Sequence, residues 1–124
     1  MKKVKEYTND MGFRIREELN EAGLRDGLFQ AWWENGQPWH KCTYKNGQLD
    51  GLFQEWWDNG QLWHKCAYKN GKRDGSALFW HESGKRAIEC TFKDGELDGT
   101  CREWDEEGNL IKEKTYKNGV EVTK

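Results

Sequence analysis

The residues with the clearest chemical potential form a His-Lys-Cys sequence that occurs twice, at His40 to Cys42 and at His64 to Cys66. In an extended strand, residues i and i+2 point to the same side, so each His and Cys pair shares one face. Imidazole and thiolate are common zinc ligands, and the two copies make a nominal His₂Cys₂ set. The same pair also has the residue types of a cysteine nucleophile with a histidine base.

The geometry of the predicted sheet argues against both a zinc site and a cysteine nucleophile. Equivalent residues two strands apart lie about 10 Å from each other, whereas the ligands of one zinc ion must converge within about 4 Å. We expect Phe53 to lie between the two pairs. A nucleophilic cysteine also needs an exposed, electropositive pocket, which a flat sheet does not provide. The sequence therefore predicts packed His and Cys side chains, no metal, no cofactor, no catalytic residues and no enzyme.

These residues belong to a unit of 24 residues that the chain repeats. Residues 27–50 and 51–74 match at 18 of 24 positions, and residues 75–98 and 99–124 continue the period. A fixed period of this length indicates a repeat architecture. All 14 glycines fall into three sets with this period, and the frame reaches back to Gly12. We predict one repeat domain over residues 1–124, in which 1–26 is a degenerate first copy and 1–26 and 99–124 act as caps.

Asn-Gly and Asp-Gly pairs separate the aromatic-rich runs of each unit, as at Asn35-Gly36 and Asn46-Gly47. Such pairs favour two-residue type I′ hairpins, and no segment has a helical period. The sequence predicts an all-β fold, an elongated single-layer antiparallel β-hairpin meander. Its expected strands are 13–19, 25–34, 37–45, 48–58, 61–69, 72–82, 85–93, 96–106 and 109–117.

Two-residue turns also fix the predicted register and faces. Cys42 lies opposite Phe29 and opposite Gly51, whose missing side chain Tyr44 covers. This face also holds Trp33, His40, Leu49, Phe53 and Trp57. The other face carries Trp32, Trp56, Trp80 and Trp104, with Trp39, Trp63, Ala87 and Ile111 as their directly opposed partners.

The four cysteines occupy positions typical of packed thiols. Cys42, Cys66 and Cys90 share one column of the repeat, and Cys101 stands in the column of Phe29 and Phe53. A cysteine that replaces phenylalanine behaves as a small buried hydrophobe. We favour free thiols over structural disulfides.

Composition limits the classes of partner. The chain is 35% hydrophobic and 34% charged, but 14% aromatic with eight Trp, which argues against disorder. The net charge of −2 lacks the basic excess of a nucleic-acid-binding protein. The lysines at the N-terminus precede no apolar run, and no stretch has transmembrane length. We expect a cytoplasmic protein that binds no nucleic acid.

Aromatic residues are concentrated in one stretch of the predicted sheet. Residues 27–71 hold six of the eight Trp. Large aromatic side chains dominate protein interfaces. We predict a partner-binding surface formed by Trp32, Trp33, Trp39, Trp56, Trp57, Trp63, Lys41 and Lys65. The alternative is that two recently duplicated repeats have not yet diverged.

The repeated sequence resembles a known family. The pattern Gly-x-aromatic-x-x-aromatic-aromatic-x-Asn-Gly, followed by Tyr-Lys-Asn-Gly-x-x-Asp-Gly, is similar to the MORN-type repeat, in the bacterial and viral variant of proteins labelled YwqK-family antitoxins. The resemblance covers roughly residues 5–122 and implies an elongated hairpin sheet that serves as a scaffold for contacts. The sequence departs from the pattern at Thr8, Asn20 and Asp105, which fits end repeats that act as caps.

We therefore expect a non-enzymatic protein-binding module. The resemblance favours an antitoxin-like inhibitor that occludes a toxin or another effector protein. One alternative is binding to anionic membrane lipids through Lys45, Lys69, Lys93 and Lys117, which glutamates interrupt. Another is a self-assembling scaffold or a homodimer, and because Lys and Glu along residues 110–124 protect the open edge, we expect any dimer to pack by its faces.

Overall fold

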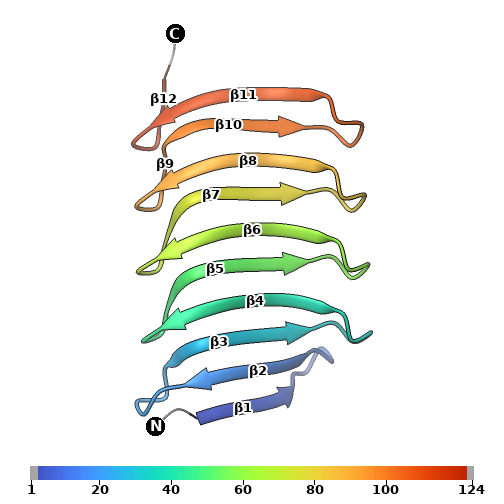
Figure 1. Cartoon of the computed structure of the whole chain (residues 1–124), viewed down its shortest axis with the longest axis vertical. Coiled ribbons are helices and arrows are strands. Elements are labelled where there is room, and N and C mark those ends of the chain that lie inside the picture. The colour runs from blue at the N-terminus through green and yellow to red at the C-terminus, as the bar shows by residue number, and fades with distance from the viewer. Residues whose placement is uncertain (1–2, 123–124) are drawn as a thin grey trace.

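The computed structural model describes residues 3–122 as a single open antiparallel sheet (Figure 1). Residues 1–2 and 123–124 of the predicted end repeats lie outside the described part. The predicted all-β meander is confirmed, because each strand pairs with its neighbour in sequence, and β9 pairs with β8 ahead of β10. The strands are β1 Lys3–Thr8, β2 Arg14–Leu19, β3 Arg25–Trp32, β4 Pro38–Lys45, β5 Gln48–Trp56, β6 Leu62–Lys69, β7 Lys72–Trp80, β8 Arg86–Lys93, β9 Glu96–Leu97, β10 Gly99–Trp104, β11 Leu110–Lys117 and β12 Val120–Glu121.

The turns at one end of the strands are the predicted two-residue hairpins. Asn46 and Gly47 have φ values of 49° and 85°, so both central residues adopt the positive φ of a type I′ turn. Asn70, Asp94 and Asn118 repeat this conformation. The flanking pair is Lys45 with Gln48, as the sequence predicts.

The turns at the other end differ from the prediction. At Asn35-Gly36 only the glycine has positive φ. The Gly36 N–H donates to the Trp33 carbonyl at 2.9 Å, and the Trp33 N–H donates to the Gln37 carbonyl at 2.8 Å. This is a three-residue loop built on a tight turn with glycine in the left-handed region. It shifts the register by one residue.

A bulge next to this loop cancels the shift. Trp32 pairs with Pro38 and Ala31 pairs with His40, which leaves Trp39 as the extra residue. A one-residue slip moves side chains to the other face of a sheet, and here the slip is confined to Trp39. The rest of β4 keeps the predicted pairing, including Phe29 with Cys42.

The predicted pairing of Cys42 with Gly51 is wrong. Cys42 pairs with Phe53, and a bulge around Gly51 takes up the additional residues between Leu49 and Phe53. Gly51 has a φ of 109°, and a Cβ there would lie 2.8 Å from the Thr43 hydroxyl oxygen. The backbone itself therefore requires glycine. The residue of β6 that pairs with Gly51 is Tyr68, so the neighbouring aromatic side chain is Tyr68 and not Tyr44.

Main-chain and carboxylate groups at the type I′ turns connect successive repeats. The Gly47 N–H donates to the Arg25 carbonyl at 2.7 Å, and the Gly71 N–H donates to the Leu49 carbonyl at 2.8 Å. The Asn46 N–H donates to a carboxylate oxygen of Asp26 at 3.1 Å. The repeated aspartates thus cap turns, as their position before the repeat glycine predicts.

The core lies on one face of the sheet. Phe29, Cys42 and Phe53 stand in one cross-strand row, which continues through Cys66 and Ala77. We call this side the inner face and the opposite side the outer face. Cys42 and Cys66 are 2% exposed, and all four cysteines are free thiols. The structure therefore uses cysteine as a small packed side chain in this row.

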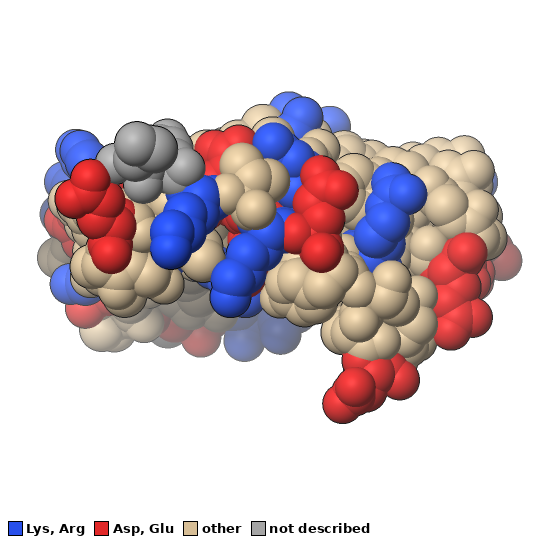
Figure 2. All heavy atoms as spheres, turned by 90° about the horizontal axis from the view of Figure 1, so that it is seen from below, with Lys and Arg blue, Asp and Glu red and all other residues tan. Residues whose placement is uncertain are grey.

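The sheet has charged edges. Every residue of β1 is exposed, and Lys3, Lys5 and Glu6 are charged. Figure 2 shows the N-terminal end of the sheet, where Lys and Arg side chains are interspersed with Asp and Glu. Mixed charge along an edge strand disfavours edge-to-edge pairing. Within residues 3–122 the structure contains no helix with the length and apolar character needed to cross a membrane.

Candidate partner-binding surface

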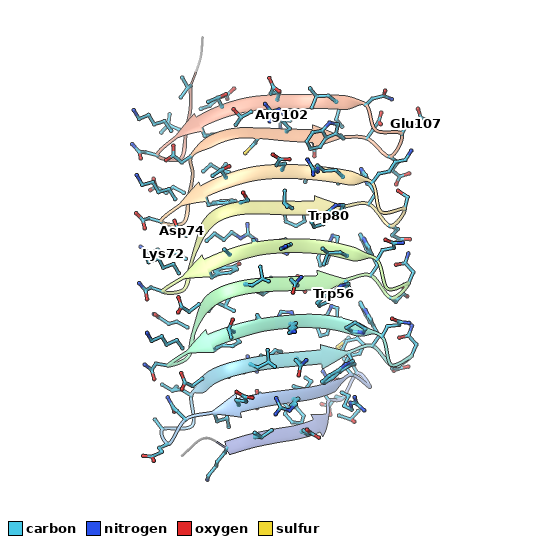
Figure 3. The ribbon with its side chains drawn as sticks, in the orientation of Figure 1. Trp56, Lys72, Asp74, Trp80, Arg102 and Glu107 are labelled. Atoms are coloured by element: carbon cyan, nitrogen blue, oxygen red, sulfur yellow. The ribbon has the colours of Figure 1, made fainter. Side chains whose placement is uncertain are left out.

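Four tryptophans form a row on the outer face, at equivalent positions of successive repeats. Trp32, Trp56, Trp80 and Trp104 each end a strand and are half-buried. Figure 3 shows Trp56 and Trp80 at the same end of their strands. Their cross-strand partners are Pro38, Leu62, Arg86 and Leu110. The prediction that Trp39 and Trp63 lie opposite Trp32 and Trp56 is wrong, because the bulge moves both residues to the inner face.

Two lysines of the outer face have no acidic partner. Lys41 pairs across the strands with Gln30 and Gln54, and Lys65 pairs with Gln54 and Leu78. Neither ammonium group makes an ion pair within residues 3–122. Further along the same face, charges are paired, as between Arg102 and Glu113 at 2.8 Å. We define the outer patch as Trp32, Trp56, Lys41 and Lys65.

The other four predicted residues are part of the inner face. The ring centroids of Trp33 and Trp39 lie 5.5 Å apart, and those of Trp57 and Trp63 lie 5.3 Å apart. Phe13 extends the first pair, at 5.0 Å from Trp39. Such tilted ring contacts stabilise packing beyond the buried area. The structure thus divides the eight predicted residues, with four on each face.

Ring nitrogens of the inner face connect each repeat to the next. Trp33 Nε1 donates to the Trp56 carbonyl at 3.3 Å, and Trp57 Nε1 donates to the Trp80 carbonyl at the same distance. His81 occupies the equivalent position in the next repeat, and its Nε2 donates to the Trp104 carbonyl at 3.0 Å. These side chains hold the repeats together. The ring N–H groups of Trp33, Trp57 and His81 are therefore not available to a partner.

A half-buried carboxylate lies between the two histidines of the His-Lys-Cys sequences. Glu55 pairs across the strands with both His40 and His64, and its carboxylate oxygens lie 3.4 Å from each Nδ1. Burial opposes ionisation of Glu55, but hydrogen bonds from the two imidazoles outweigh it and hold the pKa at about 2. His64 is 4% exposed, and its ring stacks on Phe79 at 4.1 Å. The cluster is a packed ionic group inside the sheet.

This cluster does not have the chemistry of a nucleophile or of a zinc site. Burial raises the pKa of the Cys42 thiol to about 12, so the group stays protonated although His40 Nε2 lies 3.3 Å from its sulfur. Phe53 separates Cys42 from Cys66, as predicted. Among residues 3–122, no group of three or more His, Cys, Asp and Glu side chains could hold a metal ion.

Sequence reasoning missed Glu55. The signal was present, because Glu55 replaces Ala31 and is one of the six positions at which residues 27–50 and 51–74 differ. Its location between two histidines depended on the bulge that pairs Cys42 with Phe53. The predicted register placed Gly51, and not Phe53, opposite Cys42.

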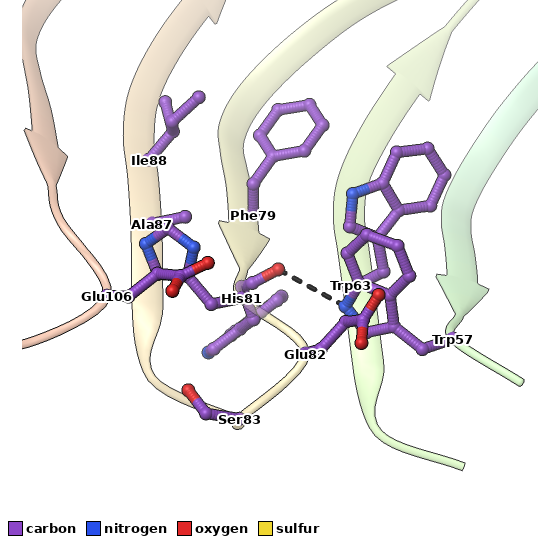
Figure 4. Close-up of a pocket in the computed structure, with 10 residues that line it drawn as sticks. Trp57, Trp63, Phe79, His81, Glu82, Ser83, Ala87, Ile88 and Glu106 are labelled. Carbon is purple, nitrogen blue, oxygen red and sulfur yellow. Dashed lines mark hydrogen bonds between the residues drawn. The ribbon is translucent and has the colours of Figure 1, made fainter. Parts of the chain in front are cut away.

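The inner face also contains a pocket of about 610 Å³ next to Trp63. Figure 4 shows Trp57, Trp63 and Phe79 on one side of it, and Ala87 and Ile88 on the other. Ala87 has the position that Trp39 and Trp63 have in the two preceding repeats. The pocket therefore includes the space that a tryptophan at position 87 would occupy.

Comparison with known proteins identifies the repeat. A family model described as the MORN repeat variant matches four consecutive segments, residues 25–46, 49–70, 73–94 and 97–118. The first three segments begin in the strand that carries the tryptophan of the outer row, and the fourth begins in β9, just before β10. Each segment ends in the next type I′ turn. The matches cover well over half of the chain, and residues 5–24 of the predicted resemblance lie outside them. A search of curated proteins finds no match.

Proposed function

Because the chain belongs to the MORN repeat variant family, we propose that it is a non-enzymatic module that binds a partner protein on the outer patch. MORN repeats are commonly protein- or membrane-binding modules, and the family is generally non-catalytic. The finer assignment, to a protein partner at Trp32, Trp56, Lys41 and Lys65, rests on the geometry of the outer face.

The observation that carries this proposal is the combination of half-buried indoles with unpaired ammonium groups. A sheet face with apolar side chains gains stability when a second layer covers it, and no second layer covers the outer face within residues 3–122. Trp32 and Trp56 offer large contact area at a low cost in conformational entropy. Lys41 and Lys65 select a partner with acidic groups, because opposite charges steer association.

Within this class we favour an antitoxin-like inhibitor in the cytoplasm. A rigid sheet without a catalytic group would act by occlusion, which needs only a stable surface that covers the active site of a toxin or effector. The resemblance noted in the sequence supports this role. The identity of the partner stays a prediction.

The test is affinity capture of the tagged chain from host lysate, with Trp32→Ala/Trp56→Ala as the variant and Trp104→Ala as the matched control. Trp104 belongs to the same row but lies outside the outer patch. We expect one stoichiometric protein to be retained by the wild type and by the control, and to be reduced at least tenfold with the double variant. Circular dichroism of the purified variants must show an intact sheet.

Two results would contradict this proposal. If the double variant retains the partner as well as the control does, the outer patch is not the binding surface. If the double variant unfolds, Trp32 and Trp56 belong to the structural core.

A second candidate function is binding to anionic lipid. Lys45, Lys69, Lys93 and Lys117 are exposed at equivalent positions, each as the last residue of a strand before a type I′ turn. Each lysine near an anionic surface contributes about 1 kcal/mol. The carboxylates of Asp26, Asp50 and Asp74 accept hydrogen bonds in the same turns. Their negative charge reduces the positive potential of the lysines. Salt-sensitive sedimentation with phosphatidylserine vesicles, absent with phosphatidylcholine vesicles, would favour the lipid function over a protein partner.

A further inference from the structure

The pocket beside Trp63 has walls that are fixed before any ligand binds. Trp57 is held by its hydrogen bond to the Trp80 carbonyl, and His81 is held by its bond to the Trp104 carbonyl. The indole of Trp63 packs against Trp57 at 5.3 Å and against Phe79 at 6.3 Å. Since the side chains are already packed or bonded, a ligand would not have to order them, which lowers the entropy cost of binding.

Two carboxylates line the pocket, together with the imidazole of His81 and the hydroxyl of Ser83. Glu82 and Glu106 both line it, and Figure 4 shows Glu82 next to Trp57 and Trp63, with Glu106 on the opposite side, next to Ala87. Both residues are exposed, and within residues 3–122 neither carboxylate takes part in an ion pair. No Lys or Arg lines the pocket. Aromatic faces and carboxylates together attract a cation.

The molecule already uses this kind of contact elsewhere. The guanidinium carbon of Arg14 lies 4.6 Å from the ring centroid of Trp32, and that of Arg25 lies 4.4 Å from Phe29. A planar guanidinium stacks on an aromatic face and can bind a carboxylate with two hydrogen bonds, and it is less strongly hydrated than an ammonium group. Arginine therefore fits the combination of indole faces and carboxylates better than lysine does.

We propose that this pocket binds an arginine side chain from a basic peptide segment of a partner protein, with the guanidinium between the indole of Trp63 and the carboxylates of Glu82 and Glu106. The site goes beyond the outer patch, because it lies on the other face of the sheet and selects a basic group where the outer patch selects acidic ones.

The test uses the full chain and a short probe peptide, Ac-Gly-Arg-Gly-NH₂, with binding followed by tryptophan fluorescence and by the indole N–H signals in NMR spectra. The citrulline peptide is the matched ligand control, because it keeps the shape of arginine without its charge. We expect saturable shifts of the Trp57 and Trp63 indole signals with the arginine peptide, and affinity at least tenfold lower with the citrulline peptide.

Two variants examine the pocket itself. Ala87→Trp fills it without removing any of its walls, and should abolish binding. Glu82→Gln/Glu106→Gln removes only the charge, and should weaken binding at least tenfold. The matched control is Glu34→Gln, which changes the equivalent position of the first full repeat, where Trp39 fills the corresponding space.

The outcomes separate this site from the outer patch. Trp32→Ala/Trp56→Ala should leave binding of the arginine peptide unchanged, whatever that variant does to the captured partner. Equal affinity for the arginine and citrulline peptides would overturn the proposal, as would unchanged binding in the Glu82→Gln/Glu106→Gln variant. Tighter binding of the lysine or trimethyllysine peptide would overturn the assignment to arginine.

Discussion

The first half of the sheet is filled with large side chains, and the second half keeps the same turns with smaller side chains. One inner column runs Phe29, Phe53, Ala77, Cys101, and the bulge column runs Trp39, Trp63, Ala87, Ile111. The column that connects repeats runs Trp33, Trp57, His81, Asp105. Within residues 3–122, all buried side chains lie between Ile15 and Ala77, whereas Leu110 and Ile111 are 51% and 59% exposed.

The hydrogen bonds at the turns do not follow this decline. The Asp105 N–H donates to the Asn109 carbonyl at 2.9 Å, as the Trp33 N–H donates to the Gln37 carbonyl at 2.8 Å. The Gly119 N–H still reaches the Leu97 carbonyl at 2.8 Å. Turn chemistry thus defines the architecture, and side-chain volume sets how stable each repeat is within it. In a linear array, stability is the sum of such local contributions.

The largest effect is expected from the inner column. Phe29→Ala should lower the free energy of unfolding by about 3 kcal/mol, because it removes a buried ring and leaves a cavity. Cys101→Ala changes the equivalent position of the last repeat and should cost less than about 1 kcal/mol. Urea unfolding followed by circular dichroism measures both. Equal costs would show that the last repeat is packed as tightly as the first.

The sequence predicted the parts of the fold that depend on residue type alone. The type I′ turns followed from Asn-Gly and Asp-Gly, because few residues tolerate positive φ at two successive positions. The three-residue loop at Asn35-Gly36 could not be distinguished from a type I′ turn, because Asn-Gly is compatible with both. Strand β1 was missed because its exposed sequence Lys3–Thr8 has no aromatic pattern of the repeat.

The candidate site was less predictable, because it depends on register. The one-residue bulge at Trp39 decides which face receives this indole, and no residue type in the sequence marks it. The bulge at Gly51 decides that Glu55, and not Phe53, lies opposite His40. The residue types therefore identified the aromatic residues that form surfaces. The strand pairing determined which of these residues share a face of the sheet.

The next effect concerns the ionic cluster of Glu55, His40 and His64, which lies in the first half of the sheet. Glu55→Gln should lower the free energy of unfolding at neutral pH by about 2 kcal/mol, because it removes a half-buried charge from two imidazole partners. Glu89→Gln is the control, since Glu89 is half-buried and pairs with the exposed Arg86. Exposed pairs contribute about 0–1 kcal/mol.

The pH dependence of this difference has a defined sign. The folded-state pKa of Glu55 is about 2, below its ordinary value of 4.5. The stabilisation is therefore fully present above pH 4.5 and is lost as the pH falls from there towards 2. Urea unfolding of the wild type and of Glu55→Gln across this range should converge at low pH. A constant difference would show that the carboxylate is not the source.

A smaller effect is expected from the bonds between repeats. Trp57→Phe keeps an aromatic ring but removes the Nε1 donor to the Trp80 carbonyl, and should cost about 1 kcal/mol. Trp63→Phe is the matched control, because no hydrogen bond of its indole nitrogen is found within residues 3–122. Thermal unfolding compares the two. A larger cost for Trp63→Phe would mean that packing, and not the N–H group, connects these repeats.

The smallest expected change converts a position of the second half to that of the first. Ala87→Trp should raise the free energy of unfolding by about 0.5 kcal/mol, because filling a cavity stabilises and two preceding repeats already hold tryptophan there. Ile111→Trp, in the same column, should have no effect, since Ile111 is exposed. If Ala87→Trp gains stability and loses arginine binding, the alanine maintains a ligand pocket at a cost in stability. A destabilised variant would instead show that the walls of the pocket have closed around a small residue.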